Sequence, residues 1–133
     1  MRAFILSLAL LLASFGPAQA QQSDIQGVIS SQIEAFRADD FATAFTFAHP
    51  NIKNMFRTPE NFGRMVIHGY PMVWRPAEVE YLDLRQESGR TLQDVRIVDA
   101  DGRVFLLEYT MAETEDGWRI RGVRILENTA VTA

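Results

Sequence analysis

Two turns that end in glycine constrain the fold of this chain more than any other feature. The turns Asp99–Gly102 and Thr114–Gly117 separate runs in which apolar and polar residues alternate. Alternation with a period of two is typical of half-buried strands, and glycine readily adopts the backbone conformation of a tight hairpin turn. The sequence therefore predicts an antiparallel sheet of four consecutive strands between residues 78 and 128.

The hydrophobic pattern also predicts the register of the strands, because a shift of one residue would turn every side chain to the other face. Ile97 should face Phe105 in the hairpin closed by the first turn. In the next hairpin, the register that keeps neighbouring arginines out of the apolar face places Gly122 opposite Tyr109. A tight turn at Ser88 and Gly89 should pair the first strand with the second.

A helical layer precedes the sheet. Residues 25–36 and 41–48 carry apolar side chains at helical spacing, and Thr58 caps a further helix that begins at Pro59 and ends at Gly69. Helices followed by a paired antiparallel sheet predict an α+β fold, with the N-terminal helices packed on one face of the sheet.

Two linking segments are predicted to be less regular. Residues 51–56 should form a single turn. Residues 70–76 should run extended as a strap along the core, because residues before a proline avoid the helical region. Trp74 in this strap is a candidate ligand contact.

The first twenty residues have the pattern of a secretory signal peptide. Arg2 precedes an apolar run from Ala3 to Ala13, and Ala18-Gln19-Ala20 is a small-residue cleavage signal. The sequence thus predicts a signal peptide over residues 1–20, a single domain over residues 21–133, a periplasmic or secreted location, and no membrane span after cleavage. The chain has no cysteine, so this domain must fold without disulfides.

The net charge of the chain and the spacing of its histidines restrict the partners that we expect. Without Arg2, 12 Lys and Arg stand against 17 Asp and Glu, and such an acidic balance does not favour nucleic acid as a partner. His49 and His68 lie 19 residues apart with no metal-ligand spacing, and both are predicted as surface residues near helix C-termini. No cofactor motif is found, so neither a metal nor a cofactor is predicted.

Three polar side chains interrupt the predicted inner face of the sheet. Gln93, Tyr109 and Arg124 fall on neighbouring rows around Gly122. They could bind a small ligand, with arginine contacting an anionic group. Alternatively, Gln93 satisfies backbone groups of the helices, Tyr109 packs over glycine, and Arg124 extends to the rim.

The predicted outer face is too apolar for a fully hydrated surface. We therefore expect a second copy of the chain to cover it and form a homodimer. The apolar residues that the register places there are Tyr81, Val98, Val104, Leu106, Val123 and Ile125.

Four motifs carry a resemblance to a known family: Thr58-Pro59-Glu60-Asn61-Phe62, Gly69-Tyr70-Pro71, Arg75-Pro76 and Gly117-Trp118-Arg119-Ile120. With these motifs, and above all with the segment from Phe56 to Pro76, the chain resembles a bacterial family named domain of unknown function 4864. The resemblance covers nearly all of the mature chain, and the sequence departs from the family pattern at His49 and Val123. That family is similar to the nuclear-transport-factor-2-like superfamily, which implies a curved sheet and helices that form a cone around a pocket, often in a homodimer.

The resemblance implies architecture more than activity, since the superfamily includes isomerases, dehydratases, cyclases and non-catalytic members. Whether the chain is an enzyme stays open, and we favour a non-catalytic module that binds a small ligand or a partner. The alternative is an acid–base enzyme of the isomerase, dehydratase or hydrolase type with its site in the concavity of the sheet, which would require a carboxylate or histidine inside the pocket.

Overall fold

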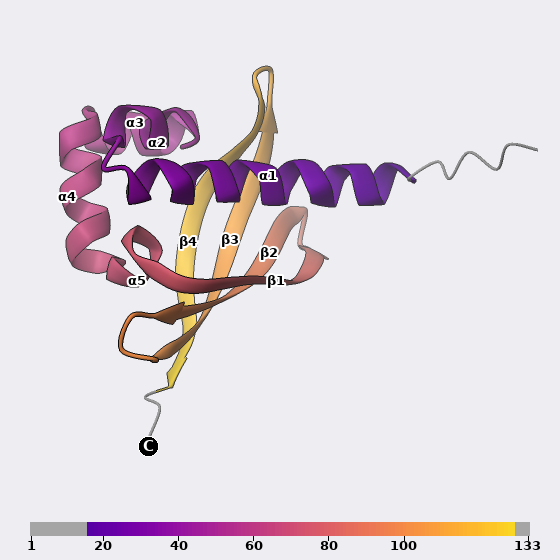
Figure 1. Cartoon of the computed structure of the whole chain (residues 1–133). Helices are drawn as coiled ribbons and strands as arrows, with labels where there is room; N and C mark the ends of the chain where they lie inside the picture. The colour runs from indigo at the N-terminus through magenta and orange to yellow at the C-terminus, as the bar shows by residue number, and fades with distance from the viewer. Residues whose placement is uncertain (1–15, 130–133) are drawn as a thin grey trace, which may run out of the picture.

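The computed structural model describes residues 16–129. The long helix α1 (Pro17–Arg37) lies across the sheet, and four shorter helices gather near its C-terminal end (Figure 1). They are α2 (Phe41–Thr46), α3 (Pro50–Phe56), α4 (Pro59–Gly69) and α5 (Pro71–Trp74). The antiparallel sheet has the order β1 (Pro76–Glu87), β2 (Arg90–Asp99), β3 (Val104–Thr114) and β4 (Gly117–Thr129). The predicted α+β fold is confirmed.

Side-chain caps begin the helices where the sequence predicts them. The Thr58 hydroxyl accepts a hydrogen bond from the backbone N–H of Asn61 at 3.1 Å, with Pro59 in the first turn of α4. Asp40 accepts from the N–H of Thr43 at 3.1 Å and caps α2. Most of the predicted signal peptide lies outside the described residues, and residues 17–20 form the first turn of α1.

The prediction of an extended strap over residues 70–76 is wrong. Pro71 begins the short helix α5, because a proline at the first helical position already has a helical φ and needs no hydrogen bond from its nitrogen. The two residues directly before a proline have the expected non-helical backbone, Tyr70 with φ −136° and ψ 53° and Arg75 with φ −136° and ψ 68°.

The register of the β2–β3 hairpin is confirmed, whereas that of β3–β4 is only half right. Ile97 faces Phe105, and Ile120 faces Met111. Beyond that pair, Arg121 is an extra residue in β4, so Tyr109 faces Val123 and not Gly122. A bulge of this kind adds one residue to one strand and changes which face the following side chains occupy.

This bulge corrects the predicted faces of β4. Val123 and Ile125 lie beside the core, where their apolar side chains pack, and Arg124 moves to the outer face opposite Glu108. A bulge in β1 between Tyr81 and Leu84 has a similar effect. Tyr81 turns inward, and its hydroxyl hydrogen-bonds to α1. Tyr81, Val123 and Ile125 therefore do not belong to the outer face.

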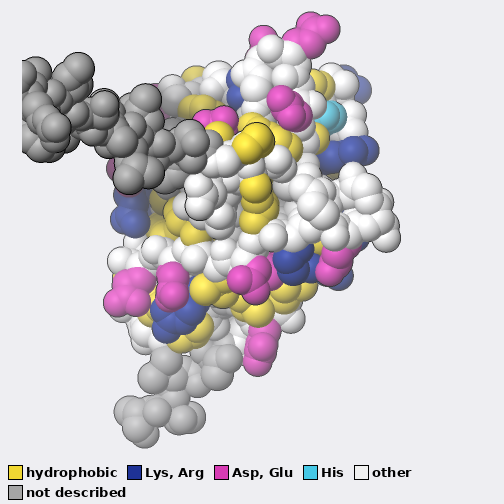
Figure 2. Space-filling view, turned by 90° about the vertical axis from the view of Figure 1, so that its right-hand side faces the viewer, with side chains coloured by type: hydrophobic (Ala, Val, Ile, Leu, Met, Phe, Trp, Pro, Cys, Tyr) yellow, Lys and Arg dark blue, Asp and Glu magenta, His cyan; other side chains and the backbone are white. Residues whose placement is uncertain are grey.

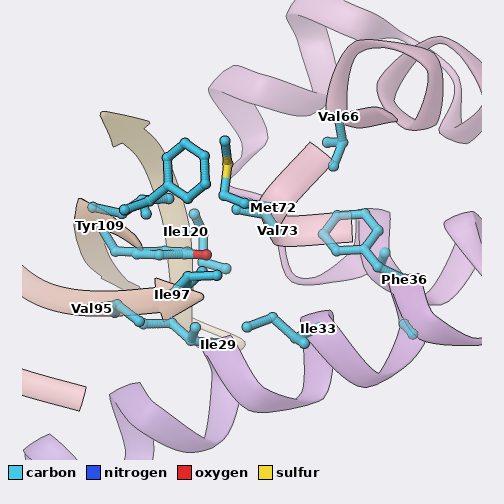
Figure 3. Packing of buried hydrophobic residues seen from close by; sticks show 14 of the residues in the cluster. Ile29, Ile33, Phe36, Val66, Met72, Val73, Val95, Ile97, Tyr109 and Ile120 are labelled. Carbon is cyan, nitrogen blue, oxygen red and sulfur yellow. The ribbon is translucent and has the colours of Figure 1, made fainter. Parts of the chain in front are cut away.

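The core lies between α1, α5 and the inner face of the sheet. Ile29 and Ile33 of α1 point toward the strands, which contribute Val95 and Ile97 (Figure 3). Phe36 of α1 packs against Phe62 of α4. Burial of such side chains is the main favourable term in folding. On the side of the molecule shown in Figure 2, acidic and basic side chains alternate with hydrophobic ones. Within residues 16–129, no helix is both long and apolar enough to cross a membrane.

Candidate functional site

A cavity of about 260 Å³ lies between α3, α4, α5 and the edge of β4. Its polar lining residues are Gln32, Tyr70 and Arg121, and the remaining lining is apolar. The apolar lining comes from Phe36, Ala48, Ile52, Met55, Phe56, Phe62, Met65, Val66, Val73, Ile120, Gly122 and Val123. The arrangement suits a small apolar molecule, because ligand pockets are predominantly apolar with a few polar groups that set orientation.

The bulge in β4 explains why the cavity opens at this point of the sheet. Before the bulge, Ile120 exchanges backbone hydrogen bonds with the α2–α3 connection, to Phe47 O at 2.9 Å and from His49 N at 2.8 Å. After the bulge, the Tyr70 hydroxyl donates to Val123 O at 3.0 Å. Between these two attachments, Arg121 and Gly122 line the cavity. The bulged part of β4 therefore lies between two hydrogen-bonded positions, Ile120 and Val123, and its residues form one wall of the cavity.

An aromatic cluster forms the helical side of the cavity. The ring of Phe62 lies 5.2 Å from that of Phe45, and 5.9 Å from those of both Phe36 and Phe56. Such tilted and edge-on contacts favour a fixed arrangement of rings. Gly63 allows α4 to approach α2 closely, since a Cβ at this position would lie 2.7 Å from the ring of Phe41. The close approach fixes the wall that carries Phe62 and Val66.

One apolar side chain at the cavity is largely exposed to solvent. Met55 at the end of α3 is 71% exposed, although it lines the cavity together with the half-buried Ile52 and Phe56. Methionine is flexible and adapts to differently shaped apolar partners. Met55 therefore gives the cavity an adaptable apolar rim.

Of the four predicted ligand contacts, the structure brings together only Gln93 and Tyr109, which are direct cross-strand partners. Neither lines the cavity. Gln93 is fully buried, and its Nε2 donates to Leu82 O at 3.1 Å and to Asp94 O at 2.9 Å. The amide thus satisfies backbone carbonyl groups of β1 and β2. The alternative prediction, in which Gln93 satisfies backbone groups of the helices, is therefore wrong in its partners.

Tyr109 is fully buried, and its hydroxyl has no hydrogen-bond partner among the described residues. Gln93 Oε1 is the other buried polar side-chain atom in residues 16–129 that has no hydrogen-bond partner. Burial raises the pKa of Tyr109, and the neighbouring Tyr81 and Tyr70 raise it further. The hydroxyl therefore stays protonated and can donate a hydrogen bond at physiological pH.

Arg124 lies on the outer face, with its side chain 68% exposed, and contacts Glu108 at 3.1 Å. Glu108 also accepts from Arg85 at 2.7 Å, and Arg85 forms two hydrogen bonds with Asp94 at 2.8 and 2.9 Å. These four residues are called the outer-face ion-pair cluster below. They explain the position of Arg124 without a ligand.

Trp74 joins α5 to the end of α1. Its indole N–H donates to Asp39 at 2.9 Å, and the guanidinium of Arg75 lies 4.1 Å from the centre of its ring. Arg75 also donates to Asp39 at 2.9 Å and to Phe36 O at 2.7 Å. The hydrogen bonds from Trp74 and Arg75 lower the pKa of Asp39. Trp74 and Arg75 thus attach the last turn of α1 to the start of the sheet.

The two histidines lie outside the cavity lining. His68 is exposed in the last turn of α4, as predicted, whereas His49 caps the N-terminus of α3 and accepts from Asn51 N–H at 3.1 Å. The predicted position of His49 near a helix C-terminus is therefore wrong, because Pro50 begins a helix here. Within the described part of the chain, no group of three His, Cys, Asp or Glu could hold a metal ion.

The residues of α3 that line the cavity are not among the site residues predicted from the sequence. Ile52, Met55 and Phe56 recur at the helical spacing of three and four, but residues 51–56 were predicted to form a single turn. Pro50 at the first helical position, with His49 as its cap, is the signal that indicates the longer helix.

A family model described as Domain of unknown function (DUF4864) matches residues 18–133. No curated protein and no solved structure matches the chain.

Proposed function

We propose that this chain, which belongs to the family Domain of unknown function (DUF4864), binds a small apolar molecule in the cavity between α3, α4, α5 and β4. The observation that carries the proposal is the apolar lining of a space of about 260 Å³ beside the exposed Met55. The proposal replaces the predicted site around Gln93 and Arg124 with one formed by the helices and the bulged edge of β4.

The size of the cavity indicates the size of the ligand. An apolar cavity of about 150 Å³ is large enough for benzene. A cavity of about 260 Å³ therefore suits a molecule with roughly ten non-hydrogen atoms. Naphthalene has this size and no polar group, which makes it a suitable first probe.

A binding function accounts for the lining better than acid–base catalysis does. Within the described residues, the lining includes neither a carboxylate nor a histidine. An acid–base mechanism here would therefore lack the usual groups that transfer a proton.

Titration of the purified mature protein with naphthalene, followed by its fluorescence, tests the proposal. Met65→Trp places a larger side chain in the wall of the cavity and should weaken binding at least tenfold. Leu126→Trp, at a position that is 40% exposed and outside the lining, is the matched control and should bind as the wild type does. Thermal unfolding of both variants checks that they remain folded. Equal binding by Met65→Trp, or no binding by the wild type, would contradict the proposal.

We further propose that the protein is exported after removal of residues 1–20. Residues 17–20 are exposed, and the first buried side chain of α1 is that of Ile25, so cleavage after Ala20 removes no described core side chain. N-terminal sequencing of the protein from the periplasm or the medium should begin at Gln21. An intact N-terminus on the folded protein would exclude this proposal.

The homodimer and the relationship to the nuclear-transport-factor-2-like superfamily also remain proposals. The corrected outer face retains the half-buried Val98, Val104 and Leu106, with Leu126 exposed beside them on β4. A second copy covering this face would bury them. Light scattering should then give the dimer mass at micromolar concentration, and a monomer would refute the assembly.

A further inference from the structure

Tyr109, whose hydroxyl has no partner among the described residues, is the cross-strand neighbour of a residue in the wall of the proposed binding cavity. Tyr109 directly faces Val123 across β3 and β4, and Val123 lines the cavity. Tyr70, which also lines it, is near enough to raise the pKa of Tyr109 electrostatically. The ring of Tyr109 points from the sheet toward the helical layer (Figure 3). The hydroxyl is therefore directed to the side of the sheet on which the cavity lies.

A buried hydroxyl without a partner requires an explanation. Buried polar groups are almost always hydrogen-bonded, and leaving one unpaired is unfavourable. The other tyrosine hydroxyls in this part of the protein are satisfied, since Tyr70 donates to Val123 O and Tyr81 is bonded to α1. Tyr109 alone among the described tyrosines is fully buried with an unused hydroxyl.

From these observations we infer that the ligand of the cavity carries one uncharged hydrogen-bonding group, a hydroxyl or a carbonyl, that binds the hydroxyl of Tyr109. This inference rests on the proposed function and specifies its ligand class. Val123 is half-buried, faces Tyr109 and lines the cavity, so the polar group of the ligand would reach the hydroxyl past the side chain of Val123. The apolar body of the ligand then remains against α3 and α4.

The environment of Tyr109 explains why the group should be uncharged. The core residues around Tyr109 are apolar or aromatic except for the neutral Gln93 opposite it, and Tyr109 itself has no exposed surface. Transferring a carboxylate into such surroundings without a paired cation is strongly unfavourable. Arg124, the cation that the sequence placed beside Tyr109, lies on the opposite face, and Arg121, the cation in the cavity lining, is exposed to solvent and not buried with Tyr109. A neutral hydroxyl or carbonyl can accept the hydrogen bond without this penalty.

Three probes with the same ring system test the inference. Naphthalene has no polar group, 2-naphthol carries a hydroxyl, and 2-naphthoate carries a carboxylate. The wild type should bind 2-naphthol about tenfold more tightly than naphthalene, which corresponds to one hydrogen bond. It should bind 2-naphthoate more weakly than 2-naphthol. Titrations followed by probe fluorescence measure all three dissociation constants.

Tyr109→Phe removes only the hydroxyl, so naphthalene binding should be unchanged and the preference for 2-naphthol should disappear. Tyr81→Phe is the matched control, because it removes a tyrosine hydroxyl that is already bonded to α1 and lies outside the cavity lining. This control should retain the preference. A crystal structure of the wild type with 2-naphthol gives a measurement that does not depend on any variant, and the naphthol oxygen should lie within hydrogen-bond distance of Tyr109.

The outcomes separate the two proposals. If naphthalene binds but 2-naphthol binds no more tightly, or if the preference persists in Tyr109→Phe, the inference about Tyr109 is overturned and the apolar site remains. Tighter binding of 2-naphthoate than of 2-naphthol would also overturn it. If none of the probes binds, the proposed function fails and the inference fails with it.

Discussion

Glu108 and Tyr109 are adjacent in β3 and point to opposite faces of the sheet. The buried polar group of Glu108 is hydrogen-bonded, whereas that of Tyr109 is not bonded to any described residue. On the outer face, Glu108 is buried, and its carboxylate contacts Arg85 at 2.7 Å and Arg124 at 3.1 Å. On the inner face, Tyr109 is also buried, and its hydroxyl has no partner among the described residues. The outer face thus satisfies its buried carboxylate, whereas the inner face leaves two buried polar atoms without a partner in the described part of the chain, the hydroxyl of Tyr109 and Oε1 of Gln93.

The difference follows from charge. A buried carboxylate without a partner is so unfavourable that it must be paired, so the outer-face ion-pair cluster is explained by folding alone. A neutral hydroxyl can remain unpaired at a smaller energetic cost, which a ligand can recover on binding. Satisfied polar clusters therefore indicate structural roles, and an unsatisfied neutral group indicates a candidate contact for a ligand.

Replacing Arg85 with methionine should have the largest effect on stability. Arg85 bonds both Asp94 and Glu108, which lie directly opposite each other on β2 and β3. Without the guanidinium, two carboxylates repel each other in a largely buried position. We expect the free energy of unfolding to fall by about 3 kcal/mol, measured by urea denaturation at pH 7.

Arg124→Met is the matched control, because Arg124 contacts the same carboxylate of Glu108 but has a side chain that is 68% exposed. An exposed pair contributes less than about 1 kcal/mol, so this variant should be nearly as stable as the wild type. It should also bind naphthalene normally, since Arg124 lies outside the cavity lining. Equal losses in the two variants would show that the cluster does not depend on burial.

The outer-face ion-pair cluster should also make stability depend on pH. The hydrogen bond from Arg85 lowers the pKa of Glu108, with further contributions from Arg124. A carboxyl group with a lowered pKa stabilises the fold above its ordinary pKa of about 4.3, and this contribution is lost as the pH falls through the lowered value. Glu108→Gln should therefore show a flatter dependence of unfolding free energy on pH below about pH 5, by roughly 1 kcal/mol.

The comparison between wild type and Glu108→Gln isolates this one group. Asp39 and Asp40 also have lowered pKa values, through hydrogen bonds from Trp74 and Thr43 respectively, but they are present in both proteins and cancel. Identical pH profiles would mean that Glu108 does not carry the acid dependence. Urea denaturation at a series of pH values provides the measurement.

The sequence predicts those parts of the molecule that repeat a regular period. Alternating residues predict the pairing of Ile97 with Phe105, and local caps such as Thr58 predict where helices begin. The bulge at Arg121 is not predictable in this way. The residues on either side of a bulge keep the same alternating pattern, so the pattern does not show where the extra residue stands. The misplacement of Arg124 and Val123 follows from that single residue.

The candidate site depends on features that a local pattern does not contain. Pro71 begins a short helix in the structure, although the same residue also fits an extended strap. The cavity forms where α3 and α4 meet the bulged edge of β4, and only the assembled fold brings Ile52, Met65 and Val123 together. The sequence nevertheless identifies Tyr109 as a polar interruption of the inner face, and the structure confirms its position there.

Tyr109→Phe should have the smallest effect on stability and the opposite sign to Arg85→Met. The ring packing is preserved and an unpaired buried hydroxyl is removed, so the free energy of unfolding at pH 7 should stay the same or rise by up to about 1 kcal/mol. Because burial raises the pKa of Tyr109 in the folded protein, the hydroxyl should ionise first in the unfolded chain. Wild-type stability should then fall above about pH 10, and the variant should lack this part of the loss. If the variant instead loses more than about 1 kcal/mol at pH 7, the hydroxyl has a partner, such as a buried water, and Tyr109 is satisfied as Glu108 is.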